Sequence, residues 1–170
     1  MLFQRDKKTS PVAARLAQTA YRDGSSALGP KLPTMRTGEV TPRAVVIGFY
    51  RHLDDAMGVL HLGTACQSGC DYCCYYHTVA SPMEVFAIRE HVMGLDGPER
   101  ERVFDQLAQN LETIQPLTPD QHNETNVPCP FLVSRHCSIY DLRPVACRRH
   151  HCVDVTPCKA AFHDPRTSDR

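Results

Sequence analysis

The cysteines are the residues of this sequence with the clearest capacity for chemistry. There are nine of them, at Cys66, Cys70, Cys73, Cys74, Cys129, Cys137, Cys147, Cys152 and Cys158. None occurs before residue 66 or between residues 75 and 128, where scattered core cysteines would appear as readily as anywhere else. Thiolates are preferred ligands of soft metal ions and of iron–sulfur clusters. Their gathering therefore indicates a site for a metal or a cluster.

The first cysteine segment, residues 66–74, reads C-x3-C-x2-C-C. Gly69 lets the backbone turn tightly, so that thiolates on either side of it can converge on one ion. The adjacent pair Cys73-Cys74 is less usual, because neighbouring side chains of extended backbone point to opposite sides. This pair suggests two metal centres or bridging thiolates, although a turn at this point could also bring both thiols to one ion.

The second cysteine segment, residues 129–147, contains Cys129-Pro-Phe-Leu, then Cys137-Ser-Ile-Tyr, and then Arg143-Pro ahead of Cys147-Arg. Together with the first segment, this order resembles the YkgJ-type cysteine-cluster family, marked by C-x(2,3)-C-x2-C-C, C-P-F-L and C-x-I-Y-x-x-R-P-x-x-C-R. The resemblance covers residues 60 to 155. One departure is Asp71-Tyr72, where the family often has glycine directly before the C-C pair.

The resemblance implies a domain that chelates zinc or iron, and it implies no settled activity. The metal ligands that we expect are Cys66, Cys70, Cys73, Cys74, Cys129, Cys137, Cys147 and, five residues further on, Cys152. Four thiolates on one divalent ion leave a net charge of about −2. We therefore expect Arg143 and Arg148, with Arg149 as a further candidate, to offset this charge by donating to sulfur or to Asp141.

The spacing of the cysteines bears on the identity of the metal. Structural zinc usually takes four ligands drawn as two short pairs, whereas this chain gathers seven or eight thiols that include one adjacent pair. We expect an iron–sulfur cluster or iron, with zinc as the alternative. A cluster would use four cysteines and leave the others for a second site, while two zinc ions would use all eight.

Three other interpretations stay open beside the metal-binding domain. The resemblance extends to flagellin lysine N-methylases, which use S-adenosylmethionine, so whether the chain is an enzyme is undecided; none of its nine glycines forms a G-x-G pair. A zinc-ribbon-like interaction module is disfavoured by the neutral charge and the C-C pair. Structural disulfides are disfavoured by that pair and by the lack of a signal-peptide pattern.

Several residues near the motif have a plainer explanation. Cys158 lies outside the recognised motif, and serine at this position is expected to cost least of all the cysteines. A loop histidine is more often solvated than a ligand, and this applies to His77, His136, His150 and His151. Three tyrosines, Tyr72, Tyr75 and Tyr76, are expected to pack against helices.

The elements that must position these residues are mainly helices. Cap-and-proline signals at Ser10-Pro11, Thr41-Pro42 and Ser81-Pro82 predict helix starts, and Glu84 completes a capping box. A further helix is expected from Pro98 to Ile114 because apolar residues recur at spacings of three and four. The prolines of residues 115–130 predict a long loop, and FLV and CSIY predict strand fragments or turns.

We therefore predict a mostly α fold, a small helical bundle with two irregular cysteine-rich segments at one end. Residues 1–40 are expected to form a helical arm and linker, 41–162 the metal-binding domain, and 163–170 a disordered tail. The formal net charge of zero argues against nucleic acid as a partner. No apolar run suggests a signal peptide or a membrane partner, so we expect a cytoplasmic protein with reduced thiols.

Overall fold

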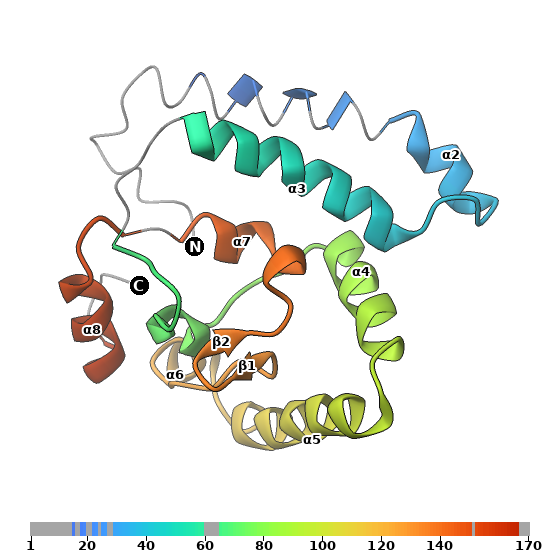
Figure 1. Cartoon of the computed structure of the whole chain (residues 1–170). Coiled ribbons are helices and arrows are strands. Elements are labelled where there is room, and N and C mark those ends of the chain that lie inside the picture. Colours follow the sequence, from blue (N-terminus) through green and yellow to red (C-terminus); the bar gives the residue numbers. More distant parts are fainter. Residues whose placement is uncertain are drawn as a thin grey trace. The chain divides into compact units, whose positions relative to one another are not determined.

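The computed structural model describes residues 29–59, 65–150 and 152–166, together with positions 15, 18, 19, 22, 23, 25 and 26 (Figure 1). The chain divides into two compact units, Met1–Leu62 and Gly63–Arg170. Most described residues are helical, which confirms the mostly α prediction. The predicted boundary at residue 40 and the placement of the cysteine segments at one end of a bundle stay predictions.

The first unit contains helices α2 (Lys31–Arg36) and α3 (Pro42–Val59). Thr41 caps α3 as predicted, since its hydroxyl oxygen accepts a hydrogen bond from the Ala44 amide at 3.2 Å. Helix α2 lies within residues 1–40, which are predicted to form a helical arm and linker. Pro33 fits there because amides of the first helical turn have no partner within the helix. The helix predicted from Ser10 falls largely outside the described residues, and its described positions are helical.

The second unit begins with the short 3-10 helix η1 (Tyr72–Tyr75), followed by α4 (Pro82–Met93) and α5 (Gly97–Ile114). The capping box at Ser81 and Glu84 is confirmed. Asp96 caps α5 by accepting from the Glu99 amide at 2.9 Å. Helices α4 and α5 contact each other, and α4 also contacts η2 (Tyr140–Leu142).

Residues 115–166 contain more regular structure than predicted. The expected long loop includes α6 (Pro119–Asn123), which Thr118 and Gln121 hold by a second capping box. The FLV and CSIY runs do contain strand fragments, and β1 (Leu132–Val133) pairs antiparallel with β2 (His136–Cys137). Two helices follow η2, α7 (Val145–Arg148) and α8 (Thr156–His163).

The fully buried side chains of the second unit are small, and they lie on several elements: Ala87, Val103 and Ala161 are each 0% exposed. Ile139 and Leu142 add buried apolar surface around η2. Of the predicted disordered tail, His163 ends α8 and residues 164–166 are described, while residues 167–170 lie outside the description. Across the described part of the chain, none of the helices combines the length and apolar character that crossing a membrane requires.

Candidate metal centre

The two cysteine segments lie against each other through backbone hydrogen bonds. The amide of Cys129 donates to the carbonyl oxygen of Cys74 at 2.8 Å. The Ala65 amide donates to the carbonyl oxygen of Cys152 at 2.7 Å. Figure 1 shows η1 and the β1–β2 hairpin side by side. Cysteines more than fifty positions apart in the sequence are thus neighbours in the fold.

The first segment is a series of turns. Gly69 has a φ of +85°, a left-handed conformation that favours glycine, and the Cys70 amide donates to the Gln67 carbonyl oxygen at 3.0 Å. Cys73 and Cys74 then lie within η1, so their backbone is not extended. The structure therefore has a turn at this pair, and the number of ions that the two thiols would bind stays a prediction.

The second segment is positioned mainly by α5. The carbonyl groups on either side of Cys129 accept hydrogen bonds from this helix: Asn110 Nδ2 donates to Pro128 at 2.8 Å and Arg102 donates to Pro130 at 3.1 Å. The β1–β2 pairing then places the next cysteine, since Leu132 lies opposite Cys137. One long amphipathic helix therefore fixes the loop that contains the C-P-F-L motif.

The hairpin turn is attached to the first segment. Ser134 and Arg135 have φ values of +47° and +66°, which non-glycine residues rarely adopt. Arg135 pairs with Asp71 at 3.3 Å, and His136 Nε2 lies 3.0 Å from the Ser68 hydroxyl. These contacts hold the strained turn against the C-x3-C loop.

Five cysteines form what we call the five-thiol group: Cys73, Cys74, Cys129, Cys137 and Cys147. The Cys73 and Cys74 thiols hydrogen-bond each other. Cys74 interacts electrostatically with Cys129 and Cys137, and Cys147 interacts with Cys129, Cys73 and Cys137. The group therefore joins the adjacent pair of the first segment to every cysteine of the second segment.

The thiols of this group differ in acidity. The hydrogen bond from Cys74 lowers the pKa of the Cys73 thiol to about 7, and the same bond, with burial, raises the pKa of Cys74. Burial raises the pKa values of Cys129 and Cys137, and it raises that of Cys147 to about 11. Burial opposes negative charge at most of these thiols, so a cation at this position would stabilise their thiolate forms.

The two arginines predicted beside the site have different partners. The Arg143 guanidinium lies 4.1 Å above the Tyr140 ring, and its charge acts on Cys73 and Cys137. Its Nε is buried and has no hydrogen-bond partner. Arg148 is only 7% exposed and donates to the backbone carbonyl groups of residues 140, 141 and 143. Arg143 thus has a donor left for a thiolate, whereas Arg148 organises the loop around η2.

The other four cysteines form the four-thiol group: Cys66, Cys70, Cys152 and Cys158. The sulfur atoms of Cys66 and Cys152 are 3.5 Å apart. The Cys152 thiol hydrogen-bonds Cys158 as well as Cys66, and burial together with these bonds raises its pKa. Cys70 interacts electrostatically with Cys66 and Cys158 and also with Cys73, which links the two groups.

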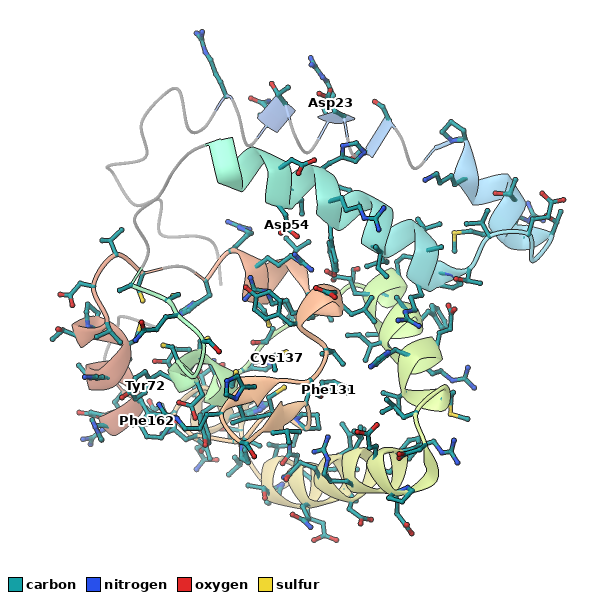
Figure 2. All side chains as sticks on the ribbon, in the orientation of Figure 1. Asp23, Asp54, Tyr72, Phe131, Cys137 and Phe162 are labelled. Carbon is teal, nitrogen blue, oxygen red and sulfur yellow. The ribbon has the colours of Figure 1, made fainter. Side chains whose placement is uncertain are left out.

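Helix α8, which the sequence analysis missed, brings Cys158 to this position. The Tyr72 ring contacts Phe162 edge-on at a centroid distance of 5.6 Å (Figure 2). The Tyr75 ring contacts the same side chain edge-on at 5.0 Å. The Tyr76 hydroxyl donates to the Cys158 carbonyl oxygen at 3.0 Å. The predicted packing of these tyrosines on a helix is confirmed.

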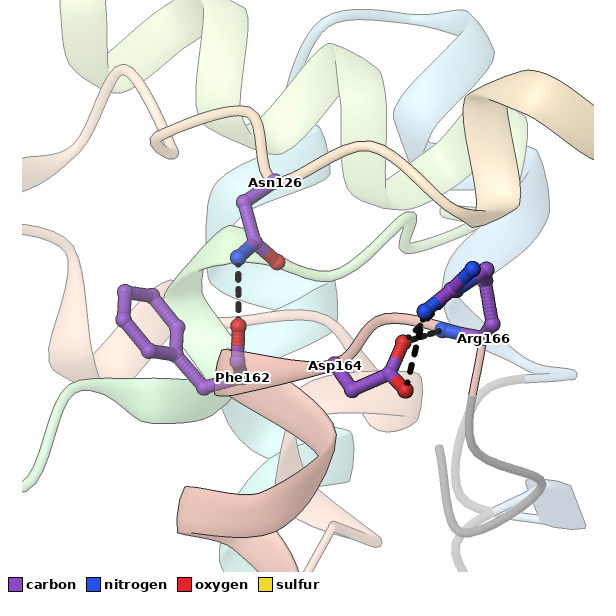
Figure 3. A network of polar contacts seen from close by, with 4 residues as sticks. All are labelled: Asn126, Phe162, Asp164 and Arg166. Atoms are coloured by element: carbon purple, nitrogen blue, oxygen red, sulfur yellow. Dashed lines mark hydrogen bonds and ion pairs between the residues drawn. The ribbon is translucent and has the colours of Figure 1, made fainter.

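Asn126 fixes the other end of α8. Its side-chain amide donates to the Phe162 carbonyl oxygen at 2.7 Å (Figure 3). Two residues after Phe162, Asp164 forms an ion pair with Arg166 at 2.9 Å. The sequence signal for α8 was Thr156-Pro157 with apolar residues at positions 158, 161 and 162.

The described histidines near the cysteines have other partners. Both ring nitrogens of His136 are engaged, with the Ser134 carbonyl oxygen and the Ser68 hydroxyl. His77 stacks on His122 at a centroid distance of 4.3 Å. His150 packs edge-on against Tyr76, and burial lowers its pKa. His151 lies outside the described residues.

The side chains at this site are chemically suited to bind a soft metal ion. All nine cysteines are free thiols, and Arg143 supplies a buried donor without a partner. Within the part of the chain that the structure describes, no three histidine, cysteine or acidic side chains surround a position where an ion could bind as they stand. The thiols contact one another pairwise, so an ion would need several of them to rotate towards a common point.

A comparison with protein families identifies the same part of the chain as a metal-chelating domain. A family model described as "CxxCxxCC: Putative zinc- or iron-chelating domain" matches residues 65–165. This range begins just before Cys66 and contains all nine cysteines. No curated protein and no solved structure matches the chain.

Proposed function

The chain belongs to the CxxCxxCC family of zinc- or iron-chelating domains, and we propose that it binds metal through the thiolates of its two cysteine segments. The proposed ligands are Cys66, Cys70, Cys73, Cys74, Cys129, Cys137, Cys147 and Cys152. Metal binding then cross-links loops that the apolar core holds only weakly, so that metal and fold are coupled.

The observation that carries the proposal is that the two cysteine segments are hydrogen-bonded to each other beside the buried Nε of Arg143. Five cysteines from the two segments interact at the five-thiol group. The unpaired Nε of Arg143 is available to donate to a metal-bound thiolate. Leaving the Arg143 Nε buried without a hydrogen-bond partner costs free energy. Thiols with a purely structural role would not offset this cost, whereas a metal-bound thiolate could accept a hydrogen bond from it.

We further propose iron, as an iron–sulfur cluster, in preference to zinc. The five-thiol group has more thiols than one tetrahedral zinc ion uses, and its adjacent pair suits a polynuclear centre better. A cluster would supply one-electron redox chemistry, whereas zinc would supply a structural cross-link. The proposed role is accordingly metal handling or redox sensing in a reducing compartment such as the cytoplasm.

Anaerobic purification followed by metal and acid-labile sulfide analysis tests the proposal. We expect bound metal, and for a cluster also sulfide and visible absorption near roughly 400 nm. Cys147→Ser should lower the metal content, because hydroxyl is a poor ligand for a soft ion. Ala146→Ser, at the neighbouring position of α7, is the matched control and should leave it unchanged. Protein free of every metal under these conditions would overturn the proposal, and zinc without sulfide would overturn the cluster.

The same preparation tests the methylase alternative. A domain that only handles metal should not bind labelled S-adenosylmethionine. Saturable binding of this compound would instead favour an enzyme related to the flagellin lysine N-methylases, and the metal would then need a role in that reaction.

A further inference from the structure

We propose that Cys158 completes a second metal site, in which the four-thiol group holds one tetrahedrally coordinated soft divalent ion of the zinc type. This inference rests on the proposed function and extends it. Of its members, Cys66 and Cys70 belong to the recognised motif, Cys152 follows five residues after the last cysteine of the motif, and Cys158 lies outside it. The fold supplies the fourth thiol from α8.

The distance between two sulfur atoms of the group suits a common ion. The sulfur atoms of Cys66 and Cys152 are 3.5 Å apart, far from the ~2.05 Å of a disulfide bond. Two ligands in a tetrahedral site with zinc–sulfur bonds of about 2.3 Å are separated by roughly 3.8 Å. The observed separation is therefore close to the edge of such a tetrahedron. The Cys152 thiol also interacts with the Cys158 thiol.

The order of the four cysteines along the chain also matches a mononuclear site. Cys66 and Cys70 form one pair on a tight turn, and Cys152 and Cys158 form a second pair six positions apart. Two short pairs from separate segments are the usual arrangement of structural zinc. The full set of cysteines does not show this arrangement of two short pairs. The four-thiol group does show it when Cys158 is paired with Cys152.

The surrounding contacts hold the two pairs together. The Ala65 amide donates to the Cys152 carbonyl oxygen at 2.7 Å, next to Cys66 in the chain. The Tyr76 hydroxyl fixes the backbone of Cys158 at 3.0 Å. Cys158 is also the third residue of α8, where the positive end of the helix dipole favours a thiolate.

Most interactions of the four-thiol group lie within the group, although Cys70 also interacts with Cys73. Cys129, Cys137 and Cys147 interact with one another and with the adjacent pair. Cys152 instead interacts with Cys66 and Cys158. Because no three of these side chains yet surround one point in the described residues, ion binding closes the group by rotation of the thiols on a backbone already in place.

Zinc titration of anaerobic, reduced full-length protein tests the assignment. We expect Cys158→Ser to lose one bound zinc ion per chain, or to bind it at least tenfold more weakly, while Ala160→Ser on the exposed face of α8 matches the parent protein. The double variant Cys152→Ser with Cys158→Ser should lose no more than the single one, because both residues serve one ion. Unchanged stoichiometry and affinity in Cys158→Ser would overturn the assignment. A parent protein that binds no metal would instead overturn the proposed function.

A measurement on the parent protein avoids any doubt about folding of the variants. With cadmium-113 bound, scalar coupling between the metal and cysteine Hβ protons identifies each ligand directly. We expect Cys66, Cys70, Cys152 and Cys158 to couple to the same cadmium ion. Coupling of the other cysteines without any coupling of Cys158 would show that its thiol is not a ligand.

Discussion

Glu84 is the residue whose replacement tests the packing around the site most sharply. Its side chain is only 8% exposed. One carboxylate oxygen accepts from the Ser81 amide at 2.7 Å, which closes the capping box of α4, and the other accepts from the Val145 amide at 2.8 Å, at the start of α7. Because α7 contains Cys147, this carboxylate connects α4 to a proposed ligand.

Glu84→Gln keeps the shape of the side chain and removes one of its two acceptors. An amide oxygen can accept from only one of the two backbone N–H groups, and the amide NH2 then faces the other. A buried donor left unpaired costs about 1–3 kcal/mol. The remaining hydrogen bond also loses its ionic character, at a cost of about 1 kcal/mol. We therefore expect the free energy of unfolding to fall by about 2–4 kcal/mol.

Urea unfolding followed by circular dichroism measures this change, and Glu99→Gln provides the matched control. Glu99 occupies the corresponding first-turn position of α5 but is exposed, so its replacement should cost within about 0.5 kcal/mol. Hydrogen exchange should also show faster exchange of the Val145 amide in Glu84→Gln. Equal stability of the two variants would refute the connecting role of Glu84.

Three further predictions follow from the turns and from the proposed metal. Gly69→Ala should destabilise the protein by about 1–2 kcal/mol because of its left-handed φ, while Gly97→Ala, in an ordinary helical position, should not; equal unfolding midpoints would contradict this. Ser134→Asn combined with Arg135→Gly should raise the free energy of unfolding by about 1–2 kcal/mol, and a lower value would show that the contacts of Arg135 outweigh the strain. A chelator should reduce hydrogen-exchange protection in both cysteine segments before α5 unfolds; unchanged protection there would rule out the coupling.

The helices that the sequence predicts well are those with local start signals. Thr41-Pro42 and Ser81-Pro82 each place a capping side chain and a first-turn proline within a few residues, so the information is local and the structure confirms both. The same signal stands at Thr118-Pro119 with Gln121. In the sequence this signal is obscured by the surrounding prolines, which favour a loop.

The arrangement of the site could not be predicted in the same way. The sequence identifies the cysteines and the arginines, but pairing depends on contacts between distant residues. Asn126 holds α8 through the Phe162 carbonyl oxygen. No local sequence pattern predicts this hydrogen bond. The position of Cys158 next to Cys152 follows only from that packing.

X-ray absorption at the metal edge of anaerobically purified protein tests whether cysteine thiolates hold the metal, because it reports the atoms bound to the metal. We expect a first shell of sulfur at about 2.3 Å, with an additional iron neighbour if a cluster is present. A first shell of oxygen and nitrogen at about 2.0–2.2 Å without sulfur would contradict it, since the cysteines would then not hold the metal.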